Sequence, residues 1–181
     1  MILKIARMGH PVLGQIASSV ADPRTPEIQR LVNDMIETMM DANGAGLAAP
    51  QVHVPLRIVV FQAPGERSDP GLTEAERFDH TAPLTVLINP EITVLNSETE
   101  GGWEGCLSVP GLRGWVTRPA HIRYRGFGAD GQVVERIARG FHARVVQHEV
   151  DHLDGRLYPG RMDDLSKLIF ESEIRHFTPA G

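Results

Sequence analysis

Apolar residues first recur at helical spacing just after a helix-start signal near residue 25. Thr25 suits the N-cap position and Pro26 suits the first position of a helix. The apolar positions that follow form one continuous stripe: Ile28, Leu31, Val32, Met35, Ile36, Met39 and Met40. The pattern predicts a core-facing N-terminal helix that ends near Asn43-Gly44, in which the methionines are packing residues.

Runs rich in β-branched residues predict strands in the middle of the chain. Strands are expected at Leu56–Phe61, Leu84–Ile88 and Ile92–Leu95, and the last two are separated by Asn89-Pro90. The alternating segment His121–Ala138 predicts a hairpin that turns at Asp130-Gly131. These strands are short, as is usual for antiparallel sheets.

The remaining segments complete the expected architecture. Small residues predict a loop over 44–51, and polar residues with Pro and Gly predict a mobile surface loop over 62–83. One helix is expected between Gly140 and Gly155. A C-terminal helix is expected to begin near Asp163-Asp164, because acidic residues interact favourably with the positive end of the helix dipole. Because strands and helices do not alternate regularly, we predict one α+β domain over 1–181, with short antiparallel or mixed sheets around the helix after Gly140.

Composition narrows the classes of function. The chain has 181 residues, 41% hydrophobic and 23% charged, and a formal net charge of −5. The absence of a run of Lys or Arg argues against a nucleic-acid ligand. No segment has the apolar length of a signal peptide or membrane span, so we expect a cytoplasmic protein, or an organellar one if a presequence has been removed. The single cysteine, Cys106, excludes an intrachain disulfide.

The expected helix after Gly140 carries the pattern HExxH, formed by His148, Glu149 and His152. Residues four apart lie on one helix face, so both histidines could bind the same metal ion. A third ligand is needed, and the spacing alone leaves more than one candidate. Glu171 lies where one class of zinc peptidase places its ligand, whereas Cys106 would give a thiolate centre with one position open for water.

One further position is a weaker candidate for the third ligand, and another is a candidate for a fourth. Tyr158 stands where another peptidase class has a histidine, and tyrosine is a poor substitute for it. A closed structural site would need a fourth ligand; His142, six residues before His148, is the nearest candidate, but it lies on a different face of the helix.

Three separate blocks resemble the signatures of the peptide deformylase family. They are GAGLAAPQ from Gly44, EGCLS from Glu104 and QHEVDH from Gln147, in the family's order and spacing. The resemblance implies that Cys106, His148 and His152 hold a divalent metal. It also implies that the enzyme removes the formyl group from the formyl-methionine of nascent polypeptides.

The resemblance also implies a role for several other residues. Glu149 would be the general base and acid, and the Gln51 side chain and the Leu107 backbone N–H would stabilise the oxyanion. Gly46 would contact the backbone of an extended substrate. By position, Phe141 and Val145 are candidates for the methionine pocket, and Arg144, one turn before His148, could reach the pocket rim or pair with an acid.

The resemblance further implies Fe²⁺ in the cell, with Zn²⁺, Ni²⁺ or Co²⁺ able to substitute. The expected partner is an N-formylmethionyl nascent peptide, and the expected state is a monomer. The C-terminal segment is not basic, so the sequence gives no support for ribosome docking. The competing hypotheses are a zinc peptidase that uses Glu171 as a ligand, and a non-catalytic metal-binding interaction protein.

Overall fold

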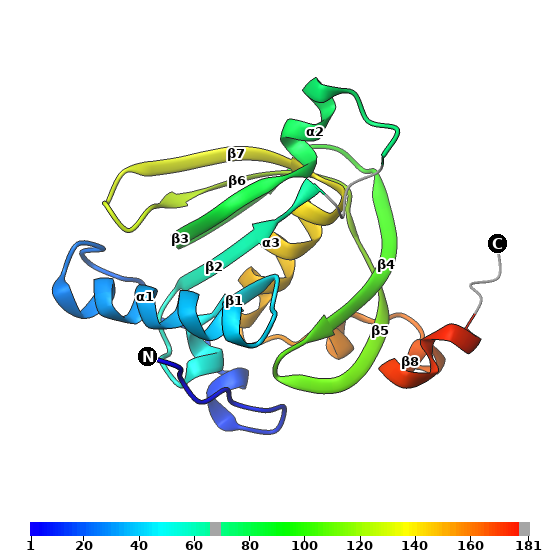
Figure 1. The fold of residues 1–181 in the computed structure, drawn as a ribbon, viewed down its shortest axis with the longest axis horizontal. Coiled ribbons are helices and arrows are strands. Elements are labelled where there is room, and N and C mark those ends of the chain that lie inside the picture. Colours follow the sequence, from blue (N-terminus) through cyan, green and yellow to red (C-terminus); the bar gives the residue numbers. More distant parts are fainter. Residues whose placement is uncertain (66–69, 178–181) are drawn as a thin grey trace.

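Two antiparallel sheets form the framework of the computed structural model, which describes residues 1–65 and 70–177. The five-stranded sheet has the order β1, β2, β3, β6, β7, with bounds Gly46–Ala48, Ile58–Ala63, Ala82–Val94, His121–Phe127 and Val133–Arg139. The three-stranded sheet has the order β4, β5, β8, with bounds Thr99–Cys106, Val109–Pro119 and Leu168–Phe170. Figure 1 shows the β4–β5 hairpin beside the larger sheet. The predicted α+β class is confirmed.

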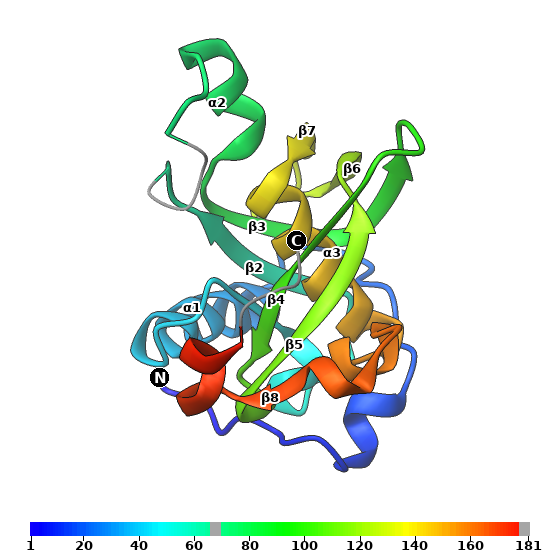
Figure 2. The ribbon, with the colours of Figure 1, turned by 90° about the vertical axis from the view of Figure 1, so that its right-hand side faces the viewer.

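Helix α3, Gly140–Leu153, lies between the two sheets (Figures 1 and 2). Gly140 has φ +54° and follows β7 directly, so the chain turns from strand to helix without a loop. A Cβ there would lie 2.7 Å from Nδ1 of His80, which also requires glycine. Val146 and Leu153 are fully buried in the main core, and the polar side chains of the HExxH segment are therefore buried as well.

Helix α1, Pro26–Asp41, covers part of the larger sheet and confirms the predicted N-terminal helix. The Oγ1 of Thr25 accepts a hydrogen bond from the N–H of Ile28 at 3.4 Å, which is the expected N-cap. Met35 and Met39 are fully buried. Met40, which the stripe placed in the core, is 45% exposed, because it lies at the edge of the packed face.

Two segments differ from the prediction in their secondary structure. The stretch 44–51 contains β1 and the 3₁₀ helix η2, Ala49–Val52, because its small residues fit between Ile58–Ala63 and α3. The predicted surface loop contains helix α2, Glu74–His80, which begins with a capping box between Thr73 and Glu76. Residues 66–69 of that loop lie outside the described residues.

The predicted C-terminal α-helix is wrong. Its place is taken by the 3₁₀ helices η5, Leu165–Lys167, and η6, Glu171–His176, on either side of β8. The reason is tertiary, because Leu168 and Ile169 pair with β5 and extend the smaller sheet. Two other 3₁₀ helices complete the fold: η1, Pro11–Gly14, and η4, Tyr158–Arg161. None of the helices in 1–65 and 70–177 has the length and apolarity that crossing a bilayer requires.

Candidate metal centre and substrate cavity

One cluster of metal-binding side chains forms where β4 ends against α3. Cys106 is the last residue of β4, and His148 and His152 lie one turn apart on α3. One ligand atom from each residue lies within 4.8 Å of the other two. This is the only group of three or more such residues found among the described residues. One thiolate and two imidazoles form a donor set that suits Zn²⁺ or Fe²⁺, so the residues fit a divalent metal.

Glu104 fixes the orientation of His148. Its Oε2 lies 2.8 Å from Nδ1 of His148, and an ionised carboxylate can only accept, so Nδ1 carries the proton. The other ring nitrogen of His148, Nε2, is thereby left with a lone pair for a metal. Burial alone would raise the pKa of Glu104, but hydrogen bonds with Arg118 and His148 hold it well below its usual range.

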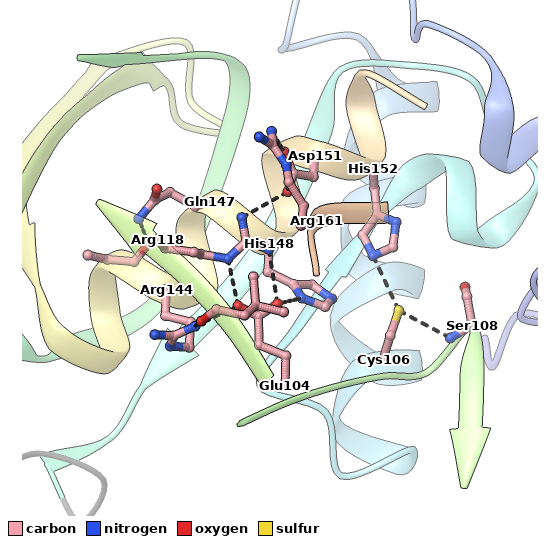
Figure 3. A network of polar contacts seen from close by, with 12 residues as sticks. Glu104, Cys106, Ser108, Arg118, Arg144, Gln147, His148, Asp151, His152 and Arg161 are labelled. Atoms are coloured by element: carbon pink, nitrogen blue, oxygen red, sulfur yellow. Dashed lines mark hydrogen bonds and ion pairs between the residues drawn. The ribbon is translucent and has the colours of Figure 1, made fainter. Parts of the chain in front are cut away.

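Three arginines and a second acid extend this network, as Figure 3 shows. Arg118 donates to both oxygens of Glu104, at 2.6 and 2.9 Å, and also to Asp151 at 2.8 Å. Arg144 donates to Glu104 at 2.9 Å and to two backbone carbonyls of the β4–β5 hairpin. Arg161 completes the set by donating to Asp151. The network ties α3 to the hairpin that carries Cys106, and it confirms the predicted pairing of Arg144 with an acid.

Glu149 lies in a position that suits proton transfer. Its side chain is 5% exposed, and its buried Oε2 has no hydrogen-bond partner among the described residues. Burial raises its pKa to about 7, which lies near the pH at which a general base is most effective. A Cβ built on Gly46 would lie 2.3 Å from Oε1 of Glu149. Glycine is therefore required at residue 46 by Glu149 itself, whatever its contact with substrate.

Gln51 points its amide group at the same cluster. Its Oε1 accepts from the N–H of Ala48 at 2.8 Å, which fixes the rotamer. Its Nε2 donates to Ser108 at 3.1 Å and lies 3.5 Å from the Sγ of Cys106. Leu107, next to Cys106, lines the same cavity. The two predicted oxyanion donors are therefore brought to the candidate metal centre from different elements.

The cluster opens into a cavity of about 400 Å³. Gly46, Phe141 and Val145, the three predicted substrate residues, all line it together with Gln51 and Cys106. Val145 is 6% exposed and belongs to the main core, so one side of the cavity is the core itself. The cavity therefore combines an apolar wall with the titratable groups of the HExxH segment.

Glu171 and His142 lie outside the metal-binding group. Glu171 belongs to η6 and pairs with Arg113 at 2.5 Å, and it is not in the metal-binding group. Both ring nitrogens of His142 are engaged, one with the backbone of Asp79 and the other with Tyr124. Tyr158 stacks on His148 with ring centroids 6.1 Å apart, and burial raises the pKa of its hydroxyl to about 12. Among the His, Cys, Asp and Glu side chains of the described residues, Cys106 is the one grouped with His148 and His152.

Several residues of the site have no role in the sequence motifs. Glu104 lies in EGCLS and Asp151 in QHEVDH, so their acidic character next to the ligand positions is a usable signal. Arg118 and Arg161 carry no such signal. The partners of Arg118 lie 14 and 33 positions away in the chain. The contact of Arg161 with Asp151 depends on how η4 packs. Ser108 lies in the block EGCLS, but its contact with Gln51 depends on the fold.

Comparisons with known proteins agree with this geometry. The family model described as polypeptide deformylase matches residues 2–168. The chain is 52% identical over 169 residues to peptide deformylase 1 of Bordetella pertussis, covering 92% of this chain and 91% of that protein. It is 51% identical over 174 residues to peptide deformylase 2 of Pseudomonas syringae pv. tomato, covering 94% and 92%.

Solved structures agree as well. The crystal structure of peptide deformylase from Ehrlichia chaffeensis superposes with a TM-score of 0.83 at 32% identity, covering 92% of this chain and 91% of that one. An actinonin-bound peptide deformylase from Acinetobacter baumannii gives a TM-score of 0.75 at 34% identity, covering 90% and 99%.

Proposed function

The chain belongs to the polypeptide deformylase family, and we propose that it hydrolyses the formyl group from the N-terminal formyl-methionine of new polypeptides, using Cys106, His148 and His152 as metal ligands. The observation that carries the proposal is the convergence of these ligand atoms within 4.8 Å, beside a buried glutamate and an oriented amide. A structural metal site needs neither of those two groups, which argues against a non-catalytic protein.

The reaction requires a nucleophile and a proton carrier. Cys106, His148 and His152 would hold a divalent cation, which would supply Lewis-acid chemistry and make water nucleophilic near neutral pH. Glu149 accepts the proton of the attacking water and returns it to the departing amine. Its raised pKa, about 7, supports both steps, because the carboxylate and the acid are then both accessible at neutral pH.

Stabilisation of the tetrahedral oxyanion is assigned to Gln51 and Leu107. The amide of Gln51 is held at its oxygen by Ala48, so its N–H groups face the cluster without further reorganisation. The backbone N–H of Leu107 would supply the second donor. Removing one such donor costs on the order of 100- to 1,000-fold in kcat in enzymes that use them.

Substrate binding is assigned to the walls of the cavity. Phe141 and Val145 supply apolar surface for the methionine side chain, and Gly46 leaves the edge of β1 open to the backbone of an extended peptide. Because all these residues come from one chain and line one cavity, we propose a monomer in which 1–181 forms a single catalytic domain. Because the relatives are bacterial, we propose that it works in the cytoplasm.

We propose Fe²⁺ as the metal in the cell, with Zn²⁺, Ni²⁺ or Co²⁺ as substitutes. The mixed thiolate and imidazole donors support this set, because harder cations such as Mg²⁺ prefer oxygen ligands. Metal analysis of protein purified without oxygen, beside protein purified in air, tests the assignment. Iron at about one per chain is expected only in the first preparation.

The direct test is formate release from formyl-Met-Ala by protein purified without oxygen and loaded with Fe²⁺. Rapid release is expected, and Glu149→Ala should lower kcat by about 100- to 10,000-fold while the bound metal stays near one per chain. Metal content is measured on each sample, so that loss of the ion is not mistaken for loss of the base. No release from metal-loaded protein would overturn the proposed function.

A further inference from the structure

A second cavity lies behind the turn that joins β4 to β5. Its volume is about 840 Å³, which is within the range of small-molecule sites. The N-terminal segment forms one wall, and Figures 1 and 2 show this segment, in dark blue, beside the tip of the β4–β5 hairpin. Leu107 and Pro110 line this cavity and also the substrate cavity. The turn after Cys106 is therefore a wall that the two cavities share.

Backbone hydrogen bonds hold the N-terminal wall in place. The N–H of Leu3 donates to the hydroxyl of Thr38 on α1 at 2.9 Å, and the N–H of Met8 donates to the carbonyl of Ser108 at 2.7 Å. The segment is thus bonded to α1 near one end and to the β4–β5 turn near the other. A ligand would therefore meet a wall that is already formed, which lowers the entropic cost of binding.

Much of the lining of the second cavity is apolar. The apolar side chains come from both walls: Ile2, Leu3, Ile5, Ala6, Leu107 and Pro110. Ile2 is 52% exposed, so the cavity leaves apolar surface in contact with water. A ligand with an apolar chain would remove this surface from water, which is favourable.

The charged groups of the same cavity favour an anion. Lys4 and Arg7 line it, and within 1–65 and 70–177 neither side chain has an ion pair or a hydrogen bond. His10 and His53 line it as well, with their ring centroids 4.7 Å apart. Asp41 is the one acid among the described residues that line it. Two fixed cations and one carboxylate make this cavity positive, in a chain whose formal net charge is −5.

Two of these side chains offer donors that suit a carboxylate. The Nδ1 of His10 accepts a hydrogen bond from the N–H of Val12 at 3.2 Å, so the proton of the neutral ring lies on Nε2. Nε2 can therefore donate to an anion without a change in the charge of the ring. The guanidinium of Arg7 has a planar fork of N–H donors, which matches the two oxygens of a carboxylate.

We propose that this cavity is a second binding site, and that its ligand is an organic carboxylate with an apolar chain. Lys4 and Arg7 bind the carboxylate, and the apolar wall that includes Ile5 and Leu107 covers the chain. Because the site is separate from the substrate cavity, it can be filled while a formyl-peptide is bound. The inference does not rest on the proposed function, because neither cation belongs to the proposed catalytic machinery.

The first measurement compares three probes by isothermal titration calorimetry with the metal-loaded protein. Decanoate has the negative charge and the chain, decylammonium has the chain with the opposite charge, and acetate has the negative charge alone. Decanoate should bind at one site per chain, at least about tenfold more tightly than either other probe, because both charge and chain contribute. No binding of decanoate, or equally tight binding of either other probe, would overturn the proposal.

Variants locate the bound decanoate. Lys4→Gln and Arg7→Gln should each weaken its binding by about two- to fivefold, as expected for exposed charges, and the double variant by about tenfold. Arg30→Gln is the matched control, because Arg30 lies on α1, makes only an exposed pair with Glu27 among the described residues, and lines neither cavity. Wild-type affinity in the double variant, or an equal loss in Arg30→Gln, contradicts the assignment.

Steady-state kinetics separate the second site from the substrate cavity. Formate release from formyl-Met-Ala is measured over a range of decanoate concentrations around its Kd. KM should stay constant, because decanoate and the peptide occupy different cavities. A KM that rises linearly with decanoate at unchanged kcat would place decanoate in the substrate cavity and overturn the second site. Absence of formate release from every sample would overturn the proposed function instead, and the binding data would still decide the second site.

Discussion

Gly46 lies where a single added methyl group would disturb the proposed general base. The added Cβ would approach Glu149 to 2.3 Å at Oε1 and 2.6 Å at Cγ. We therefore expect Gly46→Ala to displace the carboxylate and lower kcat of formate release by at least about tenfold, because misplacement by an ångström is costly in catalysis. The comparison variant is Gly160→Ala, where nothing lies within 4 Å of the added Cβ. Equal kcat in both variants would contradict this account.

Glu104 is the carboxylate that pairs with Arg118, Arg144 and His148 beside the candidate metal centre. Glu104→Gln keeps the shape of the side chain but leaves Arg118 and Arg144 without their shared carboxylate. We expect about 10- to 100-fold weaker Zn²⁺ binding, measured by competition with a chromophoric chelator. We also expect a loss of about 3 kcal/mol in the free energy of unfolding of the metal-free protein.

The control for that variant is Glu135→Gln, which breaks the exposed pair with Arg125 at 3.6 Å. An exposed ion pair contributes at most about 1 kcal/mol to the free energy of unfolding. This pair joins β6 to β7, whereas the candidate metal ligands belong to β4 and α3. Zinc affinity should be unchanged in this control. Wild-type zinc affinity in Glu104→Gln would mean that the carboxylate does not position His148.

Strand β3 continues through Asn89-Pro90, the two residues that were predicted to separate two strands. Asn89 has φ +52°, and its side chain forms two hydrogen bonds of 2.9 Å with the backbone N–H and C=O of Val20. The left-handed residue makes an irregularity in the pairing with β6, but the strand continues to Val94. The N-terminal segment is thereby joined to the centre of the sheet.

Two substitutions separate the contributions of this asparagine. Asn89→Gly and Asn89→Ala both lose the bonds to Val20, at about 1 to 3 kcal/mol. Alanine also pays about 1 kcal/mol for the left-handed conformation. We expect the alanine variant to be the less stable in urea denaturation, the reverse of the usual order within strands. If the glycine variant were the less stable, backbone strain at residue 89 would not matter.

At the scale of the whole molecule, the parts of the fold that depend on local pattern were predictable. The stripe of α1, the hairpin turn at Asp130-Gly131 and the HExxH helix all follow from spacing within a few residues. The β4–β5 hairpin was not predicted. The glycines of β4 interrupt the alternation of apolar and polar residues that predicts a strand. At one of them, Gly101, the indole of Trp115 occupies the space that a Cβ would need. Such cross-strand reasons are absent from local sequence.

The candidate site shows the same division. The candidate ligands lie in short motifs, so they could be predicted from the sequence. Arg118 could not, because its role is to join Glu104 on β4 to Asp151 on α3. The C-terminal segment has acidic residues that suggest a helix start, yet pairing with β5 makes it a strand. Long-range partners decided each of these positions.

His142 joins the inserted helix α2 to α3. Its ring is fully buried, Nδ1 donates to the backbone carbonyl of Asp79 at 2.8 Å, and Nε2 accepts from the hydroxyl of Tyr124 at 3.1 Å. This arrangement suits a neutral ring whose Nδ1 carries the proton, with Nε2 as the acceptor. Burial lowers the pKa of His142 to about 4, against a weaker opposing effect of the bond to Asp79.

The stability of the metal-free protein should therefore fall with pH in a defined window. Between about pH 6.5 and 4 the unfolded chain binds a proton at His142 that the folded protein does not, so stability is lost as pH falls. The two pKa values correspond to a loss of about 3 kcal/mol, complete near pH 4. The measurement is urea denaturation at pH 7 and pH 4 for wild type and His142→Gln, with chelator throughout. The variant should lose about 3 kcal/mol less than wild type over this interval. An equal loss in both proteins would show that His142 does not cause the acid sensitivity.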